Sequence, residues 1–172
     1  MAGELKLNNV SVATESGGVV SLSAENALAF PAGHIINFKT ATYGSEISGI
    51  TADSWVTTNL SIQITPKYTN SKIVVISTFG FTAGNPDHTG FKVQRTGPST
   101  QDLGIQSNYS NNSGFFVPQM CSYSGIDSPN TNTSLCTYTL YFYVVANPAS
   151  AYWNYDGKYS SVATMFLMEI KE

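Results

Sequence analysis

Short runs of β-branched and aromatic residues recur along this sequence, separated by clusters of Gly, Pro, Asn and Ser. Such runs are typical of strands, the clusters are typical of turns, and helical periodicity is nearly absent. The sequence therefore predicts an all-β chain. The expected strands of the main domain are Ile35–Tyr43, Trp55–Thr65, Lys72–Phe81, Phe91–Arg95, Phe115–Tyr123, Ser134–Val145 and Val162–Ile170.

Two of these runs indicate how the strands are buried. In Leu60–Thr65 apolar and polar residues alternate, which predicts one buried face and one exposed face. In Leu140–Val145 both sets of alternating positions are apolar or aromatic, so this strand is expected either in the centre of its own domain or at a subunit interface. Long strands with extended connections favour an antiparallel β-sandwich of the jelly-roll type.

Residues 1–33 differ in character from residues 34–172, which are expected to form the sandwich. They are mostly small and polar, with two weak strand signals at Leu5–Val12 and Val19–Leu22. Such a segment cannot bury much apolar surface alone, so we expect an extended N-terminal arm that attaches the domain to another molecule. The residues expected to dock are Leu5, Leu7, Val10 and Val12.

Connections between the strands predict the exposed surface. Gly97–Gly114 and Ser124–Thr133 are long and rich in Ser, Asn and Gly, so they are expected to be exposed variable loops. The shorter segment Pro66–Ser71 is expected to close a hairpin between Leu60–Ile64 and Ile73–Ile76.

Charge limits the partners of this chain. Only 11% of residues are charged, whereas Ser, Thr and Asn supply 53 of 172 positions, and the net charge is −3. A surface of this kind has little repulsion between copies, so ordered assembly is expected. The eight basic residues are scattered, which argues against nucleic acid. The first residues do not resemble a signal peptide, and no apolar run is long enough for membrane insertion, so synthesis in a cytoplasm is expected.

Residues for catalysis or metal binding are few. His34 and His88 fit neither a catalytic triad nor a metal-ligand spacing, and Asp87 beside His88 is expected in a turn. Cys121 and Cys136 could face each other across a hairpin, but two thiols are favoured over a disulfide. No pair of acidic residues has the pattern of a glycosidase. We therefore expect no enzyme activity, no cofactor and no metal.

Aromatic residues near the expected loops are the candidate contacts to a glycan or a partner. They are Tyr109, Tyr152, Trp153 and Tyr155. Aromatic rings stack on sugars, and they equally fill cores and subunit contacts, so both alternatives stay open.

Four segments resemble short virion proteins of marine and cyanobacterial tailed phages. They are MAGELKLNNVSV, FPAGHIINF, SIQITPKYTNSKIVVIS and ATMFLMEIKE, in residues 1–12, 30–38, 60–77 and 162–172. Members of that group are generally labelled tail-fibre-like or virion structural proteins. The resemblance implies attachment to other virion proteins through the arm and display of the β domain. It implies no active-site residue.

The chain has neither the heptads nor the repeats of a fibre shaft. The expected function is therefore a head decoration or cement protein, or a short fibre-like appendage, located on the virion. Analogy with the family favours a homotrimer. The alternative is a carbohydrate-binding module that recognises a glycan on the host surface.

Overall fold

The computed structural model has strands and no helix in the residues that it describes, and its sheets are antiparallel. The chain divides into two compact units, Met1–Ala32 and Gly33–Glu172. The described residues are 3–7, 10–16, 19–22, 32–47, 53–83, 87–110, 117–129, 133–144, 151–153 and 162–172.

The N-terminal unit contains a three-stranded sheet in the order β1-β2-β3. Its strands are β1 (Gly3–Leu7), β2 (Val10–Ser16) and β3 (Val19–Leu22). The prediction of one strand over Leu5–Val12 is wrong, because Leu7 pairs with Val10 and the chain reverses between them. Only two asparagines separate these residues in the sequence, and asparagine favours turns over strands.

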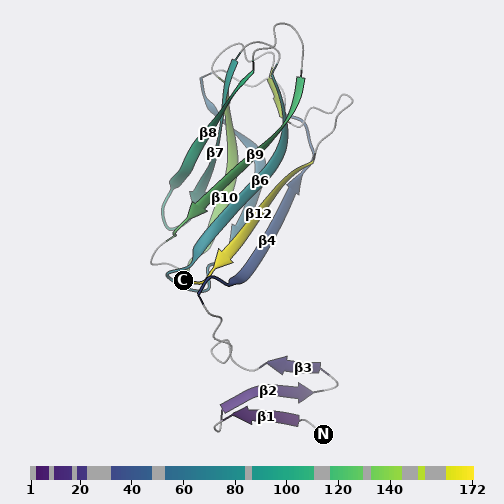
Figure 1. Cartoon of the computed structure of the whole chain (residues 1–172), viewed down its shortest axis with the longest axis vertical. Helices are drawn as coiled ribbons and strands as arrows, with labels where there is room; N and C mark the ends of the chain where they lie inside the picture. The colour runs from purple at the N-terminus through teal and green to yellow at the C-terminus, as the bar shows by residue number, and fades with distance from the viewer. Residues whose placement is uncertain are drawn as a thin grey trace. The chain divides into compact units, whose positions relative to one another are not determined.

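The C-terminal unit consists of two sheets. One has the order β5-β10-β7-β8; the other has the order β11-β6-β12-β4, with β9 on β6. Figure 1 shows β4, β12, β6 and β9 side by side in the layer nearer the viewer. The strands are β4 (Ile35–Tyr43), β5 (Trp55–Ile64), β6 (Lys72–Ala83), β7 (Asp87–Thr96), β8 (Gln101–Ser110), β9 (Val117–Asp127), β10 (Cys136–Val144), β11 (Ala151–Trp153) and β12 (Ala163–Ile170).

The strand order is that of a jelly roll. With the short β11 set aside, the first strand of the unit pairs with the eighth (β4 with β12) and the second with the seventh (β5 with β10). The third pairs with the sixth (β6 with β9) and the fourth with the fifth (β7 with β8). This is the pattern of one long hairpin rolled into two sheets. The predicted jelly-roll sandwich is confirmed.

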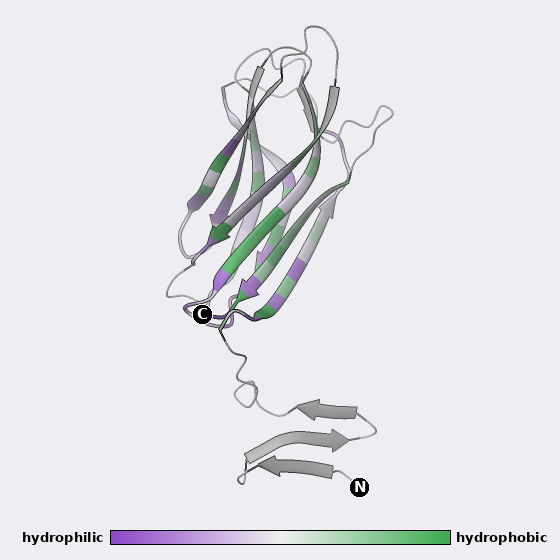
Figure 2. Ribbon diagram, viewed as in Figure 1, coloured by the Kyte–Doolittle hydropathy of each residue, from purple (hydrophilic) through white to green (hydrophobic). Residues whose placement is uncertain are grey.

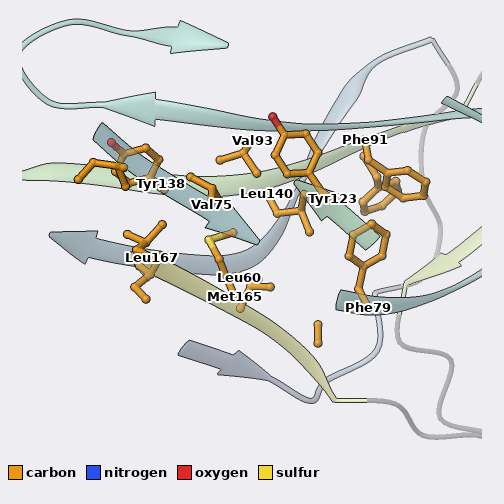
Figure 3. Packing of buried hydrophobic residues seen from close by; sticks show 14 of the residues in the cluster. Leu60, Val75, Phe79, Phe91, Val93, Tyr123, Tyr138, Leu140, Met165 and Leu167 are labelled. Atoms are coloured by element: carbon orange, nitrogen blue, oxygen red, sulfur yellow. The ribbon is translucent and has the colours of Figure 1, made fainter. Parts of the chain in front are cut away.

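Inner faces of the two sheets form the core (Figure 3). The alternation expected for Leu60–Thr65 is confirmed. β10 lies between β5 and β7, which agrees with the alternative that placed this strand in the centre of its own domain. The fully buried side chains with the largest volumes are Tyr123, Tyr138, Phe79, Phe142, Leu60, Ile64, Ile73, Leu140, Met165 and Leu167.

The hairpin predicted around Pro66–Ser71 is wrong. β5 and β6 belong to different sheets, so this connection crosses from one layer to the other. Both strands have a strongly apolar face, and these faces meet across the core instead of lying side by side. Periodicity identifies a buried face but does not identify what covers it.

Gly97–Gly114 is not one long loop, because it contains β8. β8 is an edge strand whose only core contact among its described side chains is the partly buried Leu103. Gly104 has φ +106° at a bulge in the pairing with β7. A polar edge strand interrupted by a glycine bulge lacks the alternation that reveals buried strands.

Three further predictions need correction. β9 extends four residues into Ser124–Thr133, where Asp127 is buried in an ion pair. Asp87 and His88 belong to β7 and pair with β8 instead of forming a turn. Cys121 and Cys136 do not face each other across a hairpin, because β9 and β10 lie in different sheets. The favoured prediction of two thiols is confirmed, since both cysteines are free.

Candidate binding surfaces

The outer face of the β5-β10-β7-β8 sheet carries a cluster that we call the Trp55 face: Trp55, Lys92, Tyr141 and Tyr143, with Gly90 between them. Trp55 is opposite Tyr143, and Tyr143 is opposite Gly90. Tyr141 is opposite Lys92 in the adjacent row. Directly opposed residues of neighbouring strands point to the same side of a sheet, so these side chains meet there.

A bulge in β5 sets this register. Asn59 has φ +58°, a conformation that asparagine tolerates better than most residues. The Thr58 hydroxyl turns inward and donates to the Leu140 carbonyl oxygen at 2.8 Å. The pairing of β5 with β10 shifts at this point, which places Trp55 beside Tyr143.

The Trp55 ring lies across the sheet. Its Cη2 atom is 3.2 Å from the place where a Cβ of residue 90 would be, so glycine leaves room for the ring. The Lys92 ammonium is 4.6 Å from the ring centroid and 5.7 Å from that of Tyr141. The centroids of Trp55 and Tyr143 are 5.3 Å apart. The ring thus covers Lys92, whose side chain is only 9% exposed.

Two carboxylates flank the Trp55 face. Asp102 accepts from Lys92 Nζ at 2.8 Å and from Gln94 Nε2 at 2.8 Å. The hydrogen bond from Lys92 lowers the pKa of Asp102 below its ordinary value. At the other margin Asp53 accepts from the Tyr143 hydroxyl at 2.9 Å, which raises the tyrosine pKa. Exposed acceptors therefore stand on both sides of the aromatic rings.

The outer face of the β9-β6-β12-β4 sheet carries a group of apolar residues among Ser and Thr. Ile126 is opposite Val74, Val74 is opposite Met168, and Met168 is opposite Phe38, so one apolar row crosses all four strands. The adjacent row contains Ile76 and Phe166 in its centre, with Ser124 and Thr40 at its ends. We call the apolar residues of these two rows the apolar face: Ile126, Val74, Met168, Phe38, Ile76 and Phe166.

Both margins of the apolar face are open to solvent. Phe38 is 53% exposed and Ile126 is 65% exposed, and the residues between them are half-buried. The rings of Phe38 and Phe166 stack with centroids 6.0 Å apart. Figure 2 shows hydrophobic residues concentrated along β6 and β12. Because the inner face of this sheet lies in the core, apolar residues occur on both of its sides.

A small cleft opens between the edge strands of the two sheets. It has a volume of about 190 Å³ and is lined by Phe91, Gln106, Ser107, Met120, Cys121 and Ser122. Tyr123 OH donates to the Leu103 carbonyl oxygen at 2.8 Å and Gln106 Nε2 to that of Ser124 at 3.3 Å, so β8 and β9 are tied together beside it. Pockets for drug-sized ligands usually begin near 300 Å³. The cleft therefore fits only a few atoms.

Two buried carboxylates are structural. Asp127 Oδ2 lies 2.7 Å from Arg95 Nε and accepts from the Tyr138 hydroxyl at 2.8 Å, which joins β9 to the opposite sheet. Burial, with the neighbouring Asp127, raises the pKa of Tyr138. Glu169 Oε1 accepts from the backbone N–H of Lys67 at 2.6 Å and so fixes the connection between β5 and β6. Both carboxylates are almost fully inaccessible, so neither is open to a substrate.

The structure does not gather the predicted glycan contacts into one described site. Tyr109 belongs to β8 and pairs with His88, whereas Tyr152 and Trp153 belong to β11 in the other sheet. Their side chains, and all of Tyr155, lie outside the described residues. The predicted docking residues lie in β1 (Leu5, Leu7) and β2 (Val10, Val12), and their docking stays a prediction.

The sequence pattern identified Leu140–Val145 as apolar or aromatic on both faces, but no pattern placed Trp55 beside Tyr143. Trp55 and Tyr143 are 88 positions apart in the sequence, and only the pairing of β5 with β10 brings them together. No group of three His, Cys, Asp or Glu side chains with metal-ligand geometry occurs in the described part of the chain. Nor does that part contain a helix long and apolar enough to cross a membrane.

No family model and no curated protein matches this chain. Solved structures of similar fold do exist. A chain of the infectious bursal disease virus Gx strain matches with 8% identity and a TM-score of 0.46, covering 100% of this chain and 42% of the viral one. The D431N mutant VP2 protein of the same virus matches with 10% identity and a TM-score of 0.42, covering 96% and 40%. This chain thus spans about two fifths of those viral chains.

A third similar structure is the CBM22-1 xylan-binding domain from Paenibacillus barcinonensis Xyn10C. Identity is 14% and the TM-score is 0.34, with 84% of this chain and 99% of that domain covered. Similarity at these levels has no weight for function, because unrelated functions share the jelly-roll architecture.

Proposed function

We propose that this chain is a non-enzymatic structural protein of a virus particle, displayed as a head decoration or cement protein or as a short fibre-like appendage. The jelly-roll unit self-associates, and the N-terminal unit attaches it to another virion protein. The resemblance in residues 1–12, 30–38, 60–77 and 162–172 supports the setting in a phage virion. Jelly rolls are also frequent in viral capsid domains.

The apolar face is the observation that carries the proposal. It spans four strands and has margins more than half exposed. Contiguous exposed apolar patches are uncommon on monomers and mark interaction sites. A low charge of −3 with 11% charged residues leaves little repulsion between copies. We take a second copy of this chain as the occupant and a homotrimer as the assembly, by analogy with the family that the sequence resembles.

Recognition of a carbohydrate is the second candidate function, and the Trp55 face favours it. Aromatic rings flanked by exposed carboxylates have the chemistry that binds sugars. The two functions use opposite faces of the sandwich, so one protein can perform both.

The proposed location in a phage virion is tested with particles of the parent phage that lack this protein. Full-length chain should bind them, and a variant without residues 1–32 should remain folded but fail to bind. Copy number on native particles then separates the two locations, because many copies indicate a head protein and a handful indicate a tail appendage. Full occupancy by the truncated variant would overturn the attachment role, and no binding by the full-length chain would overturn the virion assignment.

A further inference from the structure

From the arrangement of the Trp55 face we infer a binding site for a neutral oligosaccharide, with Trp55 as the stacking platform. The inference deepens the second candidate function and does not depend on the first. It places the site on the outer face of the β5-β10-β7-β8 sheet, away from Tyr152 and Trp153, which belong to β11 in the other sheet.

The Trp55 ring is held in place by its neighbours on the sheet. One side of Trp55 lies over Lys92 and reaches across Gly90, and Lys92 is nearly buried beneath it. Trp55 itself is half-buried, so part of its ring stays accessible to solvent. An indole held against a sheet loses little conformational entropy on binding, and its accessible π surface suits the apolar C–H face of a pyranose.

Hydrogen-bond acceptors lie on both sides of the aromatic rings. Asp102 is 44% exposed and has spare acceptor capacity beyond its bonds from Lys92 and Gln94. Asp53 is exposed at the other margin, beside Tyr143. These acceptors flank the aromatic rings, and sugar hydroxyls donate well to carboxylates. A stacked ring with acceptors at its edges is typical of a saccharide site.

The charge of the Trp55 face selects a neutral ligand. Lys92 is the one cation among the described residues of the Trp55 face, and it is paired with Asp102 and covered by Trp55. With Asp53 and Asp102 beside it, the site is negative overall. An acidic glycan would meet repulsion without an accessible cation, whereas a neutral pyranose meets only acceptors and apolar rings.

The test measures binding of neutral gluco-, galacto- and manno-oligosaccharides to the full-length chain by titration calorimetry. Uronate-containing and sialylated oligosaccharides serve as the acidic comparison. At least one neutral series should bind, and Trp55→Ala should weaken it about tenfold or more, as truncation of a central aromatic contact does. Asp102→Asn should weaken binding less.

Two variants locate the site. Tyr68→Ala is the matched control, because it also removes an aromatic ring that contacts a lysine. Tyr68 lies in the connection between β5 and β6, and its ring centroid is 5.0 Å from the Lys171 ammonium. This variant should bind like the wild type. Trp153→Ala should also bind normally. Because this variant keeps Trp55 as its only tryptophan, saturation with the oligosaccharide should change the Trp55 fluorescence.

Several results would overturn the inference. Loss of binding with Trp153→Ala but not with Trp55→Ala would move the site to β11. Preference for acidic glycans would contradict the charge argument, and no binding by any neutral series would remove the site. A change in oligomer mass with Trp55→Ala would make the Trp55 face a subunit contact. A variant of the apolar face that no longer assembles but still binds the oligosaccharide would support the inference, because the Trp55 face lies on the other sheet.

Discussion

At the scale of single residues, the structure depends on charges placed where water cannot reach them. Arg95 and Asp127 lie almost fully buried between the sheets, 2.7 Å apart, and Tyr138 donates to the same carboxylate. A buried pair of this kind contributes little net stability over apolar residues, but breaking it leaves one charge uncompensated. A shift of β7 or β9 along its length would separate the two charges inside the core, so the pair disfavours misaligned packing of these strands.

Asp127→Asn should lower the free energy of unfolding by about 3–5 kcal/mol, because Arg95 stays buried without a counter-charge. Tyr138→Phe is the matched variant, since it removes one hydrogen bond to the carboxylate and keeps the ion pair. We expect it to cost about 1.5–3 kcal/mol. Urea denaturation followed by circular dichroism measures both. An Asp127→Asn effect smaller than that of Tyr138→Phe would contradict this account.

Asp102 makes stability depend on pH in acid. Its pKa is lowered in the folded chain by the hydrogen bond from Lys92, so it contributes stability above the unfolded value near 3.8. That contribution is lost as the pH falls through the lowered folded pKa. Because Asp102 is partly exposed, the effect is small. Urea midpoints between pH 7 and pH 2 should fall less steeply in Asp102→Asn; an unchanged slope would contradict the assigned pairing.

At the scale of elements, the strands with strong alternation were predictable and the polar edge strand β8 was not. β5 and β10 were evident from the sequence because their inner positions are apolar. β8 was missed because an edge strand with one core contact among its described side chains and a glycine bulge has no such pattern. The sequence pattern also did not predict which strands pair. The Trp55 face could not be predicted for this reason, because its residues meet only when β5 and β7 pair with β10.

β10 offers a direct test of the inner and outer faces. Leu140→Ala should lower the free energy of unfolding by about 2–5 kcal/mol, because the side chain is fully buried and leaves a cavity. The neighbouring Thr139→Ala lies on the outer face, where substitutions usually change stability by about 0.5 kcal/mol or less. Chemical denaturation of both variants should show this contrast. Equal effects would mean that the inner face of β10 is assigned wrongly.

At the scale of the whole molecule, the two outer faces of the sandwich differ in chemistry. One sheet presents aromatic rings among polar residues, and the other presents apolar side chains across four strands. Composition predicted assembly in general, but it could not say which face assembles. The register aligns apolar residues of β9, β6, β12 and β4 that are far apart in the sequence, and this alignment is the basis for proposing the apolar face as the contact.

The central claim is that copies of this chain associate through the apolar face, and sedimentation velocity of the full-length chain tests it most directly. The sharpest comparison is the double variant Phe38→Ser with Ile126→Ser, whose positions are exposed enough to spare the fold. Ile105→Ser is the control, because Ile105 is 62% exposed and lies in the other sheet. We predict a trimer of 18.5 kDa chains for the wild type and the control, and monomers for the double variant. A wild type that sediments as a monomer, or an assembly that the double variant leaves intact, would contradict the claim.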